Sequence, residues 1–128
     1  MMAVRGIRGA ITVDHDEKEE IKNATLDLFR EILAKNKLSP ADVSCVFITA
    51  TADLSAVFPA EAIREQEDFR YIPVICAQEI EVKGAMPRCI RMLVLAMTGM
   101  APHEVRHVYL KEAQNLRKDL LEGRKPYE

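Results

Sequence analysis

One long amphipathic segment occupies much of the first third of the chain, and the rest of the chain must supply an apolar surface for it to pack on. Its apolar side chains recur at helical spacing, at Ile21, Ala24, Leu28 and Ile32. Residues 16–36 are therefore predicted as a helix, with Asp16 as the N-cap and Glu19 three residues later. A helix of this kind is stabilised mainly by packing its apolar stripe against another element. The strands predicted elsewhere have to supply that surface.

The remaining elements are mostly strands. A short helical turn over residues 60–64 is predicted to open at Pro59. The apolar run 89–97 fits either a strand or a buried helix, and the glycines and proline around it favour a bounded strand. The predicted strands cover residues 4–13, 43–50, 71–77, 89–97 and 105–110. The prediction is an α+β domain, with a mixed sheet of about five strands packed on one long and one short helix.

Length and charge limit the classes of function. The chain has 128 residues, enough for one domain with one core but hardly for a deep, water-free pocket of its own. A formal net charge of −2 argues against a nucleic-acid partner. Three cysteines without a CxxC, no signal-like opening and no apolar run of about 20 residues predict a reduced, cytoplasmic, soluble protein with no membrane partner.

Three short motifs carry little functional weight. His103-Glu104-Val105-Arg106-His107 matches the zinc-protease pattern HExxH, which needs both histidines on one helix, whereas His107 begins a predicted strand. The glycines around Arg8 do not form a phosphate-binding loop. Cys76 lacks a recognisable histidine partner, so it is interpreted as a packed thiol. No metal or cofactor is expected.

Arg91 is the more informative residue, because it interrupts an otherwise apolar run. A guanidinium cannot escape burial by losing its proton, so it needs a partner. Two interpretations remain open. One is a structural ion pair with Glu79 or Glu81. The other is a small-anion site, in which arginines and a tyrosine hydroxyl bind carboxylates and one carboxylate accepts from a hydroxyl. The candidates for it are Arg8, Arg64, Glu79, Arg91, Tyr109 and Arg117.

Several blocks of the chain resemble one family in order and spacing. They are residues 4–10 (VRGIRGA), 51–60 (TADLSAVFPA), 76–79 (CAQE), 89–91 (CIR) and 106–110 (RHVYL). Together they resemble the monofunctional chorismate mutases of the trimeric α/β type, which are unrelated in fold to the all-helical type. The resemblance runs from about residue 3 to 120. It implies a homotrimeric pseudo-α/β barrel with active sites at subunit interfaces, and rearrangement of chorismate to prephenate in phenylalanine and tyrosine biosynthesis without a cofactor.

The resemblance also implies roles for individual residues. Arg91 would donate to the ether oxygen of chorismate, Glu79 would accept from the ring hydroxyl, and Arg8 would hold the side-chain carboxylate. The implied substrate-binding residues are Tyr109, Cys76, Ile75, Val74, Phe58, Ala60, Arg64, Leu116 and Arg117. One domain is expected over residues 1–128, with 118–128 as a flexible tail.

Two positions depart from the family pattern. Ile75 stands where threonine is expected, and Glu61 stands where other members can carry lysine. We expect both to alter substrate affinity without abolishing activity. A non-catalytic trimer that binds a small carboxylate metabolite is the alternative function, and a zinc hydrolase is a third.

Overall fold

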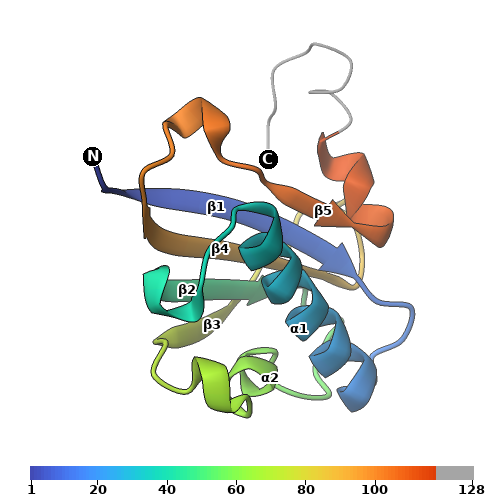
Figure 1. Ribbon diagram of the computed structural model, residues 1–128. Coiled ribbons are helices and arrows are strands. Elements are labelled where there is room, and N and C mark those ends of the chain that lie inside the picture. Colours follow the sequence, from blue (N-terminus) through green and yellow to red (C-terminus); the bar gives the residue numbers. More distant parts are fainter. Residues whose placement is uncertain (118–128) are drawn as a thin grey trace.

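The computed structural model describes residues 1–117, which form one five-stranded mixed sheet with its helices packed on one face (Figure 1). The strands are β1 (Ala3–Thr12), β2 (Val43–Ala50), β3 (Val74–Gln78), β4 (Cys89–Thr98) and β5 (Val108–Leu110). The helices are α1 (Lys18–Lys35) and α2 (Ala60–Arg64), with 3-10 turns η1 (Pro40–Asp42), η2 (Glu67–Phe69), η3 (Pro102–Glu104) and η4 (Lys111–Arg117). The predicted tail, residues 118–128, lies outside the described residues, as does the side chain of Arg117.

The strand order is β3-β2-β4-β1-β5, with β4 at the centre. β4 runs antiparallel to both of its neighbours, while β1 pairs with β5 and β2 pairs with β3 in parallel. The run that sequence left ambiguous is the strand β4, as favoured. Its even-numbered residues from Ile90 to Ala96 are buried, and Arg91, Leu93 and Met97 point to the opposite face. This alternation is the period of a strand with one face in the core.

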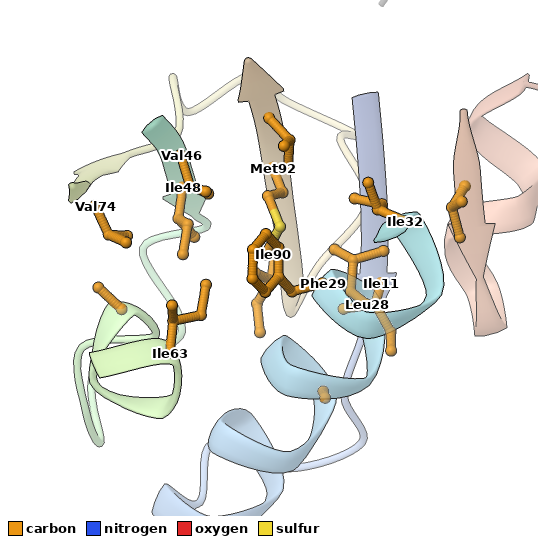
Figure 2. Packing of buried hydrophobic residues seen from close by; sticks show 14 of the residues in the cluster. Ile11, Leu28, Phe29, Ile32, Val46, Ile48, Ile63, Val74, Ile90 and Met92 are labelled. Atoms are coloured by element: carbon orange, nitrogen blue, oxygen red, sulfur yellow. The ribbon is translucent and has the colours of Figure 1, made fainter. Parts of the chain in front are cut away.

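The core lies between this sheet and α1 (Figure 2). The predicted stripe of α1 is buried as expected, and Phe29 and Leu33 extend it. Phe29 also meets Phe69 edge to face, with the ring centroids 4.9 Å apart. Ile63 of α2 closes the core over β2 and β3. Each fully buried side chain of this size contributes roughly 1.5–3 kcal/mol, so this layer holds the sheet in shape.

The N-terminus of α1 differs from the prediction by one residue. Glu17 is the N-cap, and its carboxylate accepts from the backbone N–H of Glu19. Asp16 instead reaches a distant loop, where Oδ1 accepts from the N–H groups of Ser55 and Ala56, each at 3.0 Å. Capping rules predict a partner within the helix, so this long-range use of Asp16 carries no local signal.

Two predicted strands begin later than expected. β3 starts at Val74, not at Tyr71, because the N–H of Ile72 closes the preceding turn on Phe69 and Pro73 has no N–H to donate. β5 starts at Val108, not at Val105. The side chain of Asn36 accepts from the N–H of Arg106 and donates to its carbonyl, so this residue pairs with Asn36 and not with a strand.

The second face of the sheet is only partly covered. Within residues 1–117, η4 packs against it at one end, near Ala10 and Cys89. Elsewhere this face, here called the outer face, presents exposed apolar side chains at Val4, Phe47, Ile75, Leu93 and Met97. An exposed apolar patch of this kind on a sheet is typical of an interaction site. None of the described helices is long and apolar enough to cross a membrane.

Gly9 is required by the close approach of α1 to β1. A Cβ there would lie 2.6 Å from Cδ1 of Ile32 and 3.3 Å from the carbonyl oxygen of Val108. Gly9→Ala should therefore lower the free energy of unfolding by about 1–3 kcal/mol, measured by urea denaturation. Gly99→Ala is the control, because a Cβ at Gly99 meets nothing within 4 Å. Equal stability of the two variants would contradict this packing.

Asp16 should make stability depend on pH. Burial opposes ionisation, but the hydrogen bonds from Ala56 and Ser55 outweigh it and hold the pKa of Asp16 below its ordinary value. A lowered folded-state pKa stabilises the fold above the unfolded value of about 3.9, and this contribution is lost as pH falls through the folded value. In urea denaturation between pH 3 and 6, Asp16→Ala and Asp16→Asn should both show a smaller loss of stability on acidification.

The two Asp16 variants separate the charge from the loop contact. Asparagine keeps an oxygen for the N–H groups of Ser55 and Ala56, so Asp16→Asn should be the more stable of the two at pH 7. A wild-type pH dependence in both variants would show that Asp16 does not contribute to it.

Candidate active site

Three predicted site residues meet on the outer face at the level of Ala10. Ala10 of β1 pairs with Arg91 of β4 on one side and with Tyr109 of β5 on the other. Arg8 lies two residues away on the same face of β1. The three line a cavity of about 340 Å³ together with Phe47 and Thr49. The small side chain of Ala10 leaves room between the longer ones.

The backbone of Arg8 is held by a histidine of the HExxH pattern. The N–H of Arg8 donates to Nδ1 of His107 at 2.9 Å, so that nitrogen is the acceptor and the ring is neutral in this contact. His103 belongs to η3, while His107 directly precedes β5. Because no helix carries both histidines, the geometry that a zinc protease needs is not formed.

Glu79 is the carboxylate that faces Arg91. It follows β3 directly, and its N–H donates to the carbonyl of Ala50 at 2.9 Å. Its Oε2 accepts a 2.5 Å hydrogen bond from the hydroxyl of Thr49 and lies 3.6 Å from Nε of Arg91. The ion pair that sequence left open between Glu79 and Glu81 is thus made with Glu79. Both side chains of the pair are about one-third exposed, at 32% for Arg91 and 30% for Glu79.

The ion pair does not exclude the small-anion site, because it lies at the edge of open space. Arg91 lines the cavity with Arg8 and Tyr109, and it also lines a second cavity of about 590 Å³ together with Glu79. Nε of Arg91 is shielded from solvent by the protein. A buried positive group next to a cavity attracts anions more strongly than one in water.

A second group of predicted residues gathers around α2 and β3. Cys76 and Phe58 line a cavity of about 610 Å³, and Nη2 of Arg64 donates to the carbonyl of Val74 at 3.1 Å. Burial raises the pKa of the Cys76 thiol, partly opposed by the N–H of Ala60 and the charge of Arg64. The protonated thiol is therefore favoured at neutral pH, as the packed-thiol interpretation predicts.

Not every predicted residue of this second group faces the cavity. Phe58 lines the cavity and is well exposed. The side chains of Ala60 and Val74 are buried in the core instead. The two residues that depart from the family pattern, Ile75 and Glu61, lie in different places. Ile75 is exposed on the outer face, and Glu61 lines the cavity of Cys76 together with Lys18. The wall near Glu61 therefore carries both signs of charge.

The two groups lie apart within one chain. Cys76 lines the cavity near α2, while Arg8, Arg91 and Tyr109 line the outer-face cavity, and the two cavities share no lining residue. Leu116 of η4 belongs with the outer-face group, since it packs near Tyr109. Residues 1–117 therefore form two separate partial sites.

Sequence reasoning missed two polar residues of this region. Thr49 contacts Glu79, and Asp16 holds the loop that leads to Phe58. The period-2 pattern of residues 43–50 could have placed Thr49 on the outer face, beside Phe47. Its partner could not be found without the pairing of β2 with β3 and β4. The sequence carries no comparable signal for Asp16.

The chain matches one protein family over most of its length. Residues 4–120 match the family Chorismate mutase type I. The chain is similar to the chorismate mutase AroH of Bacillus subtilis (strain 168), at 44% identity over 119 residues, which are 93% of this chain and 94% of that protein. It is 47% identical over 118 residues to the chorismate mutase AroH of Thermus thermophilus, covering 91% of this chain and 96% of that protein.

A solved structure, a chorismate mutase from Clostridium thermocellum, matches with a TM-score of 0.85 at 36% identity. The match covers 88% of this chain and 99% of that one. Family, relatives and structure agree over nearly the whole chain, so this protein belongs to the type I chorismate mutase family.

Proposed function

We propose that this chain converts chorismate to prephenate at a site in which Arg91, Glu79 and Arg8 are the catalytic residues. Membership of the type I family supports the reaction. The observation that carries the assignment of residues is the Arg91–Glu79 pair beside the outer-face cavity, with Arg8 and Tyr109 on the same cavity. The family match does not favour the alternative of a non-catalytic binder.

The reaction is an exchange of bonds within one molecule. The ether C–O bond of chorismate breaks while a C–C bond forms, without a covalent enzyme intermediate or a proton transfer. A protein can accelerate such a step in two ways. It can hold the substrate folded so that the reacting carbons meet, and it can stabilise the charge that appears as the bond breaks.

Arg91 is suited to the second task. Negative charge grows on the ether oxygen in the transition state, so a donor aimed at that oxygen binds the transition state more tightly than the substrate. The Arg91 side chain is two-thirds buried and is held on a central strand. A donor held in this way needs little reorganisation during the reaction.

The other groups on the outer face suit the first task. The Glu79 carboxylate can accept from the ring hydroxyl and support positive charge that develops on the ring. Arg8 and Tyr109 can bind the side-chain carboxylate, with the guanidinium forming two parallel hydrogen bonds. Leu116 extends the apolar wall near Tyr109.

We infer that a neighbouring subunit supplies the rest of the site. The remaining proposed substrate-binding residues are Phe58, Ala60, Arg64, Val74, Ile75, Cys76 and Arg117. The resemblance to the trimeric family implies a homotrimer, and two observations support association of copies with sites at their interfaces. The outer face is apolar and largely uncovered within residues 1–117, and the two partial sites are separate within one chain. A second chain packed on the outer face would bury its apolar side chains. It would also bring its own partial site around Cys76 next to the outer-face cavity of the first chain.

We further propose that residues 1–128 are one domain and that the protein acts in the cytoplasm. The single sheet and the family match over residues 4–120 support one domain. The three cysteines, all within residues 1–117, form no disulfide with one another, as a reducing compartment requires.

Replacing Arg91 tests the mechanism. Arg91→Ala should lower kcat by about 10²–10³, the loss typical when one preorganised donor to a developing oxyanion is removed. Arg91→Lys keeps the charge but loses the planar fork, so it should also be slow. The measurement is the conversion of chorismate to prephenate with a chelator present, which tests the zinc hydrolase at the same time.

Arg30→Gln is the control for this experiment, because Arg30 lies on α1, where its guanidinium contacts Gln66 and Phe69. It should convert chorismate at the wild-type rate. The mechanism is wrong if either Arg91 variant is as fast as wild type.

A further inference from the structure

Thr49 lies between Glu79 and Arg91, two of the charged residues of the proposed site. In the sheet it pairs with Arg91 of β4 on one side and with Ala77 of β3 on the other. Glu79 follows two residues after Ala77, so it lies on the same face of the sheet as Thr49. The hydroxyl of Thr49 donates to Oε2 of Glu79, the oxygen that is also nearest to Nε of Arg91.

The hydroxyl is not needed to hold the strands together. β2 and β3 already pair from Val46 to Ala50, and the N–H of Glu79 continues this pairing through the carbonyl of Ala50. The backbone of Glu79 is thus fixed without Thr49. The backbone does not determine where the carboxylate of Glu79 lies. The hydrogen bond from the Thr49 hydroxyl does.

The position of that carboxylate affects Arg91. A carboxylate and a guanidinium attract each other and favour a fork with two parallel hydrogen bonds. Here Oε2 of Glu79 lies 3.6 Å from Nε of Arg91, beyond the usual range of such a bond. The hydroxyl of Thr49 holds this oxygen instead, so the pair attracts without closing into a fork.

We propose that Thr49 is a positioning residue for the mutase reaction: its hydroxyl holds Glu79 at the distance where Glu79 and Arg91 can each contact the substrate. This inference rests on the proposed function, because it takes Glu79 and Arg91 as catalytic. Without the hydroxyl, the carboxylate closes on Arg91. The guanidinium donors are then directed to Glu79 and away from the ether oxygen.

Two substitutions of Thr49 test the proposal. Thr49→Val keeps the branched shape that suits a strand and removes only the hydroxyl, so kcat/KM should fall about tenfold, as expected for a lost hydrogen bond to a charged group. Most of the loss should be in kcat, since Arg8 and Tyr109 still bind the carboxylate. Thr49→Ser retains the hydroxyl and should restore most of the activity.

Thr98→Val is the matched control. Thr98 lies at the far end of β4, and its hydroxyl accepts from the N–H of Met100 at 3.2 Å. This variant removes a strand threonine hydroxyl outside the site, so it should keep wild-type kcat and KM. Circular dichroism and thermal unfolding confirm that each variant is folded before its rate is compared.

A double-mutant cycle with Glu79→Ala separates positioning from a general disturbance of β2. If Thr49 acts only through Glu79, Thr49→Val should cause no further loss in the Glu79→Ala protein. Losses that add would contradict the proposal. So would a folded Thr49→Val with wild-type kinetics, or a Thr49→Ser as slow as Thr49→Val. If Glu79→Ala is too slow to measure, the comparison of Thr49→Ser with Thr49→Val tests the proposal by itself.

The outcomes also distinguish the two proposals. A Glu79→Ala protein with wild-type activity would overturn the catalytic assignment of Glu79, and the role of Thr49 with it. A slow Glu79→Ala together with a wild-type Thr49→Val would overturn only the role of Thr49.

Discussion

The structure depends on one unusual placement, a permanently charged arginine in the central strand of a sheet. Arg91 has apolar neighbours along β4, and the cost of its partial burial is offset by Glu79 from the end of β3. The strand order places β3 on the far side of β2 from β4 and brings Glu79 level with Arg91 across Thr49. Arg91 also lines two cavities, so the ion pair leaves it next to open space.

The two faces of the sheet have different roles, one in the core and one at the proposed site. One face packs on α1 and α2 and holds the strands in register, so the outer-face residues are positioned by a rigid layer. The other presents Arg8, Arg91 and Tyr109 among apolar side chains. A chain of 128 residues can build a stable core or enclose a substrate, but it has little material for both. In the proposed assembly, several copies would meet on the outer face and each chain would complete the site of its neighbour, which would resolve this conflict.

Much of this could be predicted from the sequence, and the failures have physical causes. Helical spacing of apolar residues identified α1, apolar runs indicated the strands, and the apolar setting of Arg91 showed that it needed a partner. Strand starts were wrong where a single contact decided them, as with Pro73 and with Asn36 bound to Arg106. Asp16 and Thr49 could not be assigned partners, because each contacts residues at least 30 positions away. Such contacts depend on topology, which local patterns do not encode.

The central claim is that each site combines Arg91 of one subunit with Arg64 of another. Subunit mixing tests it directly. Arg91→Ala and Arg64→Ala proteins, each impaired alone, are unfolded together and refolded as mixed trimers, and prephenate formation is measured. If the two arginines come from different chains, about one site in four in a random equal mixture is intact, and activity rises well above that of either parent. If both arginines serve one site from the same chain, no mixed site is intact, and an activity no higher than the mean of the two parents would contradict the claim.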